Sequence, residues 1–317
     1  MESNVITRRQ ALKIMGTGLS AIALSPFFVG CETPIPPQPI NNGEDNNNNN
    51  SFPALPGFIK GLNLPWTYYG HDIGKHPDWS HDGFSNQYSK ARLEQEFDYM
   101  KNLGVDLCRV FLFCDYRAGL DNQYVNEDMQ ALLDTSHHYK IRILPSLVDF
   151  NIQNTHPEFI TTNRNNFLED KIRPFIRNFG NNEAVYAWEV INEPRWATSI
   201  RKADMKSFIS DCASLIKQET SKPVCFGAHD SGSFHDYDNA YCDLAQIHYW
   251  HSWNPLVTPT SSISNKPILI GETAPTNITF KLDSVLANGF KGLLFWRDED
   301  YRFEPVENEF RNYQIAA

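Results

Sequence analysis

The sequence predicts an α/β protein of the (β/α)8 or TIM barrel class, and three observations support this prediction. Eight short apolar runs, of the kind that form buried parallel strands, follow one another from residue 58 to residue 296. Amphipathic stretches with apolar residues three and four positions apart separate several of these runs. The segment that holds them, about 265 residues, is close to the typical barrel size of about 250.

Strand-like and helix-like elements alternate along this segment. The strand-like runs span 58–64, 106–113, 141–148, 184–191, 223–228, 244–250, 267–273 and 292–296. Helical periodicity is clearest at 89–104, 126–140, 201–219 and 281–289, and several of these stretches end at a glycine or a lysine. Helices after the fifth and sixth runs are hard to recognise. An open, doubly wound sheet is the alternative fold, but it usually carries a glycine-rich phosphate turn after its first strand, and "GLNLPW" is not one.

The N-terminal residues are expected to lie outside this fold. Residues 1–30 have the layout of an export signal: paired arginines in "TRRQALK" precede a weakly apolar stretch, and the whole resembles a twin-arginine signal. The ending "FFVGC" resembles a lipoprotein box, which makes Cys31 the expected lipidated residue. Residues 31–51 are rich in proline and asparagine and should form a flexible tether to the domain at 52–317.

These features predict an exported protein that a lipid anchors to a membrane, at the periplasmic face or the cell surface. An uncleaved membrane anchor is the alternative, although a stretch of about 17 residues interrupted by Gly16, Gly18 and Pro26 is short for a span.

Charge and cysteine content limit the partners. The formal net charge is −10 and no stripe of lysine and arginine occurs, so nucleic acid is not an expected partner. The cysteines that follow the tether are odd in number and lie mostly in apolar segments, which predicts buried free thiols, with one disulfide bond still open. They are Cys108, Cys114, Cys212, Cys225 and Cys242. Their spacing matches no metal site, and we expect the protein to need no metal or cofactor. We also expect it to be a monomer.

Two glutamates end apolar runs at positions where a barrel places its chemistry. The run "AWEVINEP" ends in Asn192 and Glu193, and "PILIGET" ends in Glu272. Active sites of these barrels lie at the carboxyl ends of the strands, and the fourth and seventh strands face each other across the barrel mouth. Two carboxyl groups on either side of one bound group are the arrangement that glycoside hydrolysis needs. One carboxyl must donate a proton while the other is ionised.

The motifs "WEVINEP" and "ILIGET" resemble those of the retaining glycoside hydrolases of clan A, and most closely glycoside hydrolase family 5, the cellulase and β-mannanase family. The resemblance extends from about Phe58 to Trp296. It implies that Glu193 is the acid/base and Glu272 the nucleophile, with their carboxyl groups about 5 Å apart. It also implies that Asn192 bonds the 2-hydroxyl of the sugar.

The same resemblance implies roles for further residues. Arg109 matches the arginine that bonds the nucleophile, His248 matches the family histidine, and Trp296 matches a platform for the sugar. The family's tyrosine usually lies two residues after the histidine. In this chain Trp250 occupies that position and Tyr249 lies beside it, so either side chain is a candidate to hold the nucleophile.

The third strand-like run shows a second departure from the family. The histidine that many members carry after it is missing, and Asp149 or Asn151 is a candidate replacement.

Tryptophans concentrate at the predicted rim, where exposed aromatic faces can stack on sugar rings. Trp66, Trp196 and Trp250 join Trp296 as expected substrate-binding residues. We therefore predict an endo-acting, retaining β-glycoside hydrolase of a β-linked polysaccharide, with β-mannan favoured over β-glucan. An exo-acting β-glycosidase of the same clan is one alternative. A catalytically inert barrel that only binds glycans is another, from a different class of function.

Overall fold

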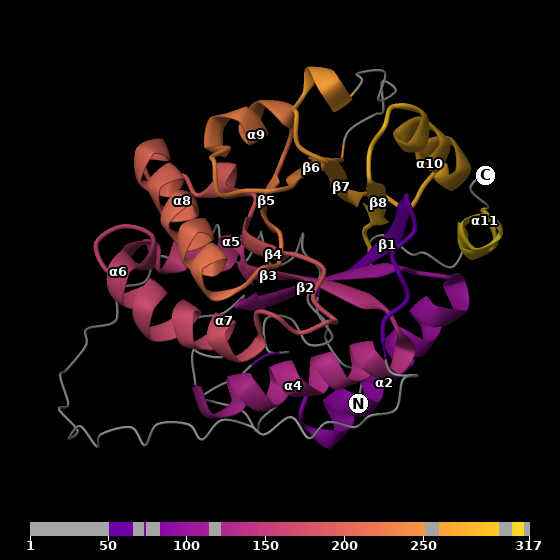
Figure 1. Cartoon of the computed structure of the whole chain (residues 1–317), viewed down its shortest axis with the longest axis horizontal. Coiled ribbons are helices and arrows are strands. Elements are labelled where there is room, and N and C mark those ends of the chain that lie inside the picture. The colour runs from indigo at the N-terminus through magenta and orange to yellow at the C-terminus, as the bar shows by residue number, and fades with distance from the viewer. Residues whose placement is uncertain are drawn as a thin grey trace, which may run out of the picture. The chain divides into compact units, whose positions relative to one another are not determined.

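The computed structural model describes residues 51–65, 73, 83–113, 122–250, 260–297 and 306–313 (Figure 1). The chain divides into a unit of Met1–Ser51 and a unit of Phe52–Ala317, and the architecture given below is that of the second unit. The predicted export signal, the lipidated Cys31 and the tether lie outside the described residues, and so do Trp66 and Cys114. Those predictions remain predictions.

Within the described residues, eight parallel strands close into a barrel in the order in which they occur in the chain. The strands are β1 (Ile59–Leu64), β2 (Leu107–Phe113), β3 (Arg142–Val148), β4 (Trp188–Asn192), β5 (Val224–Ala228), β6 (Ala245–Tyr249), β7 (Ile268–Thr273) and β8 (Gly292–Phe295). Pairing of β1 with β8, through Ile59 and Gly292, closes the ring. This confirms the predicted fold class.

Helices cover the outside of the barrel (Figure 1). The four clearest amphipathic stretches form α2 (Gln87–Leu103), α4 (Asn122–Tyr139), α8 (Lys202–Glu219) and α10 (Ile278–Ala287). The connection from β3 to β4 holds a series of short helices: α5 (Phe150–Thr155), η1 (Pro157–Phe159), α6 (Arg164–Phe167), η2 (Leu168–Ile172) and α7 (Arg173–Phe179). A short 3₁₀ turn, η3 (Pro194–Trp196), follows β4, and α11 (Glu307–Asn312) is the last helix of the described chain.

The helix after β5 is α9 (Ser231–Tyr237), which was hard to recognise in the sequence because it has only seven residues. A capping box formed by Asp230 and Ser233 starts it. After β6, the described residues contain the 3₁₀ turn η4 (Thr260–Ser262).

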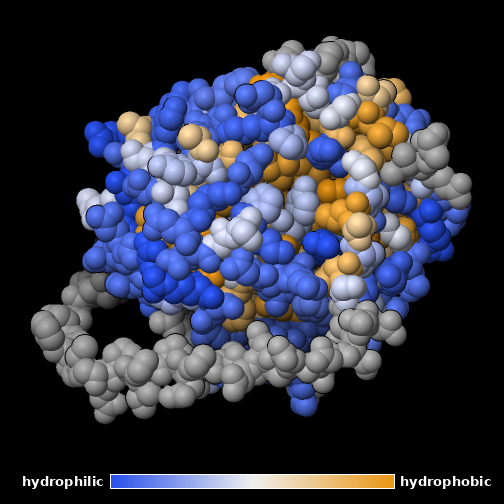
Figure 2. All heavy atoms as spheres, in the orientation of Figure 1, coloured by the Kyte–Doolittle hydropathy of each residue, from blue (hydrophilic) through white to orange (hydrophobic). Residues whose placement is uncertain are grey.

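Apolar side chains fill two regions of the molecule. The larger core lies between the strands and the helices, and a smaller cluster lies inside the barrel. Ile59, Leu107, Leu144, Ala187, Cys225, Leu244, Leu269 and Leu294 form that inner cluster, one from each strand or from the residue beside it. We call this cluster the apolar floor. Figure 2 shows that hydrophilic residues cover most of the visible face, while hydrophobic ones gather over β6, β7 and β8.

The cysteines of the described chain are free and buried, as expected: Cys108, Cys212, Cys225 and Cys242. Burial raises the pKa of each thiol, to about 12 for Cys242, so these sulfurs stay protonated at neutral pH. Among the helices of the described residues, none combines the length and the apolar character that crossing a membrane requires.

Candidate active site

A layer of polar residues lies directly above the apolar floor. Side chains of a strand alternate between its two faces, so the residue two positions beyond a floor residue points into the barrel as well. Those positions hold Arg109 on β2, Ser146 on β3, Glu189 on β4 and Gln246 on β6, all fully buried. On β5 and β7 they hold Gly227 and Gly271, which leave room for neighbouring polar groups. The barrel interior thus changes from apolar to polar within two residues.

Arg109 joins this layer to the residues at the rim. Its Nε and Nη2 donate to the two carboxylate oxygens of Glu189, each at 2.6 Å. Its Nη1 donates to Glu272 Oε1 at 2.6 Å and to Asn63 Oδ1 at 3.0 Å. Its Nη2 also donates to Asn192 Oδ1 at 2.9 Å. The two carboxylates raise the pKa of the guanidinium against the effect of burial, so Arg109 remains a cation.

Glu272 lies at the carboxyl end of β7 and is fully buried. Besides the bond from Arg109 on Oε1, its Oε2 accepts a hydrogen bond from the Trp250 indole Nε1 at 3.0 Å. Trp250 packs edge-on against Trp296 with ring centroids 5.6 Å apart, which holds the indole in place. One charged and one neutral donor therefore fix both oxygens of this carboxylate in position.

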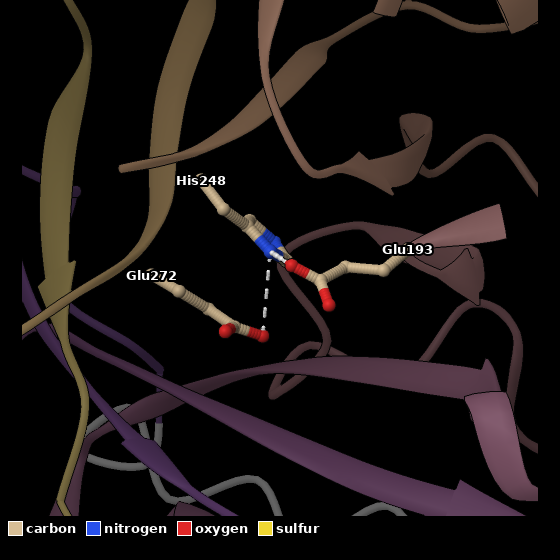
Figure 3. A group of neighbouring side chains, drawn as sticks. All are labelled: Glu193, His248 and Glu272. Carbon is tan, nitrogen blue, oxygen red and sulfur yellow. Dashed lines mark hydrogen bonds and ion pairs between the residues drawn. The ribbon is translucent and has the colours of Figure 1, made fainter. Parts of the chain in front are cut away.

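Glu193 approaches from the opposite side, directly after β4 (Figure 3). Its backbone is left-handed, with φ of 45°, and Pro194 follows at the start of η3. A non-glycine residue in this region costs about 1–2 kcal/mol, which the surrounding contacts must offset. Its Oε1 lies 2.9 Å from His248 Nδ1 and 3.2 Å from His229 Nδ1. Glu193 thus contacts two imidazoles, whereas Glu272 accepts hydrogen bonds from a guanidinium and an indole and shares the His248 imidazole with Glu193.

His248 lies between the two carboxyl groups in Figure 3, with Nδ1 3.5 Å from Glu272 Oε1. The environment of its other nitrogen indicates the tautomer. Gln246 Nε2, which can only donate, lies 3.3 Å from His248 Nε2, while Gln246 Oε1 accepts from the Cys225 thiol at 3.5 Å. His248 Nε2 is therefore the acceptor, and Nδ1 carries the proton that points at Glu193.

Glu193, His248 and Glu272 each offer one ligand atom within 4.8 Å of the others, a geometry that could also hold a metal ion. Their existing contacts do not favour such an ion. Both oxygens of Glu272 already accept hydrogen bonds, and the Arg109 cation lies 2.6 Å from one of them, where it would repel a second positive charge. The donor set fits an organic substrate better than a metal.

The structure brings most of the predicted site residues of the described chain together. Asn192 is buried and donates through Nδ2 to Asp149 Oδ1 at 3.0 Å, while the side chain of the other candidate for the histidine's place, Asn151, lies outside the described residues. The two candidates for holding the nucleophile, Tyr249 and Trp250, make different contacts. Tyr249 packs against the outer core, and it is Trp250 that reaches Glu272, because alternate residues of a strand face opposite sides.

The two remaining predicted aromatics occupy different environments. Trp296 is buried beside Phe111, whereas Trp196 on η3 is 48% exposed. Three further residues that were not expected from the sequence also contact this group. They are Glu189, which binds Arg109, and Gln246 and His229, which contact the two sides of the Glu193–His248 pair.

Solved structures resemble this chain over most of its length. An endo-1,4-β-mannanase from Eisenia fetida superposes with a TM-score of 0.68 at 18% identity, covering 83% of this chain and 93% of that one. A β-mannanase from the blue mussel Mytilus edulis gives 0.67 at 17% identity, covering 80% and 90%. A family 1 β-glucosidase from Thermotoga maritima gives 0.54 at 10%, covering 82% and 99%. At these identities the likeness shows a shared barrel fold. No protein-family model and no curated protein matches the sequence.

Proposed function

We propose that this protein is a retaining β-glycoside hydrolase. The observation that carries the proposal is the pair of buried carboxyl groups at the ends of β4 and β7, which share the His248 imidazole and otherwise have different partners. Two carboxyl groups on either side of one bound group are the arrangement that this reaction needs. The structures of similar fold include glycosidases, which agrees with this reading.

The partners assign the roles. Glu272, whose two oxygens accept hydrogen bonds from the Arg109 guanidinium and the Trp250 N–H, is oriented to act as the nucleophile. Glu193, whose Oε1 contacts His229 and His248, acts as the acid/base. In the first step Glu272 attacks the anomeric carbon, the glycosidic C–O bond breaks, and the proton of Glu193 moves to the departing oxygen. In the second step Glu193 takes a proton from water, whose oxygen displaces Glu272 from the sugar.

The closeness of the two acids supports retention of configuration. One oxygen of each lies within 4.8 Å of the other. Carboxyl groups of retaining enzymes are about 5–5.5 Å apart, whereas inverting enzymes keep about 6.5–9.5 Å to make room for a water molecule. Asn192 bonds both Arg109 and Asp149, which fixes its amide where the predicted contact with the sugar 2-hydroxyl would form.

We favour β-mannan as the substrate, with cleavage at internal bonds of the polysaccharide. Two of the similar structures described above are mannanases, and Trp196 offers an exposed aromatic face for a sugar ring. The β-glucosidase of the same fold keeps β-glucan and exo action as the second candidate. We further propose that Cys31 carries a lipid and that the protein is an exported monomer.

Sugar release from a panel of β-mannan, β-glucan, xylan and galactan tests this proposal, with purified wild type beside Glu193→Gln and Glu272→Gln. We expect release from mannan that falls more than about 10³-fold in both variants, since each loses a group essential to one step. Glu169→Gln is the matched control, because that side chain is 55% exposed and pairs with Arg173 on the outside of the barrel.

The products and the negative outcomes separate the alternatives. A β-anomer as the first product, followed by proton NMR, would establish retention. Release from glucan but not mannan would move the substrate assignment to the second candidate. Binding of a glycan without release would instead favour the catalytically inert, glycan-binding barrel.

A further inference from the structure

His229 is a second imidazole, besides His248, that contacts the proposed acid/base. It lies just after β5, on the loop that leads into α9, and its Nδ1 lies 3.2 Å from Glu193 Oε1. The hydrogen bond to Glu193 raises the pKa of this imidazole, although partial burial opposes the shift. One proton can be shared by His229 and Glu193. It can lie on the imidazole, which leaves Glu193 ionised, or on the Glu193 carboxyl, which leaves His229 neutral. The pair can therefore supply the proton that the departing oxygen requires.

Trp196 packs against His229, the imidazole that contacts the acid. The two rings pack edge to face, with centroids 5.1 Å apart and an interplanar angle of 78°. Trp196 is 48% exposed, while His229 is 18% exposed at its side chain. A single exposed aromatic ring is ordinary on a protein surface, but this ring lies one side chain away from the acid/base, where it can contact a bound ligand.

The proposed mechanism gives an aromatic ring at the position of Trp196 a possible role in binding the substrate. The acid/base delivers its proton to the oxygen that joins the two sugars, so the departing sugar must lie beside Glu193 when the bond breaks. Glu272, on the other side, bonds to the sugar that stays. An exposed aromatic face next to Glu193 is thus placed for the departing sugar.

We propose that Trp196 and His229 form the leaving-group side of this site, in which Trp196 stacks on the departing sugar and His229 holds the Glu193 carboxyl for proton transfer. This inference rests on the proposed function. His229 is a positioning residue, and Trp196 is a binding residue for a sugar of the leaving chain. The arrangement fits an enzyme that cuts between sugars of a chain, because a small alcohol or a phenol would leave the Trp196 ring uncovered.

Three substrates of the full-length protein test the two roles: mannopentaose, phenyl β-mannobioside and 2,4-dinitrophenyl β-mannobioside. Dinitrophenolate departs without a proton, phenolate needs one, and only mannopentaose places a sugar on the leaving side. The measured quantity is kcat/KM, which reports the first step. For Trp196→Ala the ratio of mannopentaose to dinitrophenyl kcat/KM should fall about tenfold, because a stacking contact is lost. For His229→Ala the ratio of phenyl to dinitrophenyl kcat/KM should fall at least about tenfold, because protonation is impaired.

Two control variants test whether the changes in these ratios are specific to Trp196 and His229. Phe280→Ala removes an aromatic ring that is 51% exposed on α10, and it should leave both ratios at their wild-type values. His229→Gln, which keeps a donor, should recover part of the phenyl ratio. Equal losses on all three substrates would mean that the two residues only stabilise the fold, and would overturn the inference while leaving the proposed function intact. A wild type that cleaves none of the three would overturn this inference and the mannan assignment, and release from the other polysaccharides of the panel would then decide whether the proposed hydrolase stands.

Discussion

Removal of Arg109 should show how much of the fold depends on the buried charges around it. In Arg109→Met, the carboxylates of Glu189 and Glu272 stay buried without their cation, and the amide oxygens of Asn63 and Asn192 lose a donor. Breaking a buried ion pair by removing one partner costs about 3–5 kcal/mol. Each orphaned amide oxygen adds about 1 kcal/mol. The expected loss, about 5–7 kcal/mol, approaches the whole free energy of unfolding of an ordinary domain, about 5–15 kcal/mol.

A double-mutant cycle tests the cause of this loss. Glu189→Met alone should cost about 3 kcal/mol, because Arg109 keeps one of its two carboxylates. Added to Arg109→Met, the same change removes an unpaired buried charge and should restore about 3 kcal/mol instead of costing more. Urea denaturation measures all four proteins. The surface variant Arg201→Met, whose side chain is 83% exposed in its pair with Asp204, is the control and should show no measurable change.

Additive losses in this cycle, within about 0.5 kcal/mol, would refute the reasoning, because they would mean that Arg109 and Glu189 do not depend on each other. If Arg109→Met fails to fold, the double variant still shows whether the coupling between Arg109 and Glu189 has the expected sign. The double variant must then fold and show a cooperative transition, and a double variant that also fails to fold contradicts the prediction.

Three further predictions each concern a single residue. Trp250→Phe removes the N–H that reaches Glu272 but keeps an aromatic ring, so kcat should fall at least about tenfold, whereas Tyr249→Phe should change it less than about twofold; equal effects would contradict the assignment. Burial lowers the pKa of Lys281 from 10.5 to about 8, so the folded state binds this proton less tightly than the unfolded state does. Between about pH 8 and 10.5 the unfolded chain therefore carries the extra proton, and stability measured by urea denaturation should rise with pH relative to Lys281→Met; a flat difference would contradict this. Cys31→Ala should move the protein from the membrane fraction to the soluble fraction, whereas an unchanged distribution on fractionation would exclude a lipid on that cysteine.

The sequence predicted the two acids because their positions follow from general rules. A strand that must be apolar ended in an ionisable group, and parallel strands of a barrel bring all such ends to one rim. The arginine at 109 could be interpreted in the same way, since a cation inside a buried strand requires a partner. That partner is Glu189, which the sequence also displays in the middle of an apolar run. Taken together, the two opposite charges inside apolar runs indicate a buried ion pair between the second and fourth strands.

Side-chain parity favours Trp250 over Tyr249, because His248 points into the barrel and the residue two positions later is expected to do the same. Strict alternation does not hold throughout the barrel: the pairing of β6 with β7 shifts register between Ile247 and His248, and Glu272 reaches the site although the adjacent Gly271 also faces the interior. His229 could not be found this way. Its contact with Glu193 depends on the course of the loop between β5 and α9, and no periodic pattern specifies where a loop places its side chains.

The buried thiols affect how the folded barrel responds to the redox state of its surroundings. Because Cys108, Cys212, Cys225 and Cys242 are enclosed and protonated, oxidants have little access to a reactive thiolate at any of them. The part of the barrel that holds them draws no stability from a cross-link among these four sulfurs. Once folded, this part of the barrel should therefore keep both its thiols and its stability whether the surrounding compartment is reducing or oxidising.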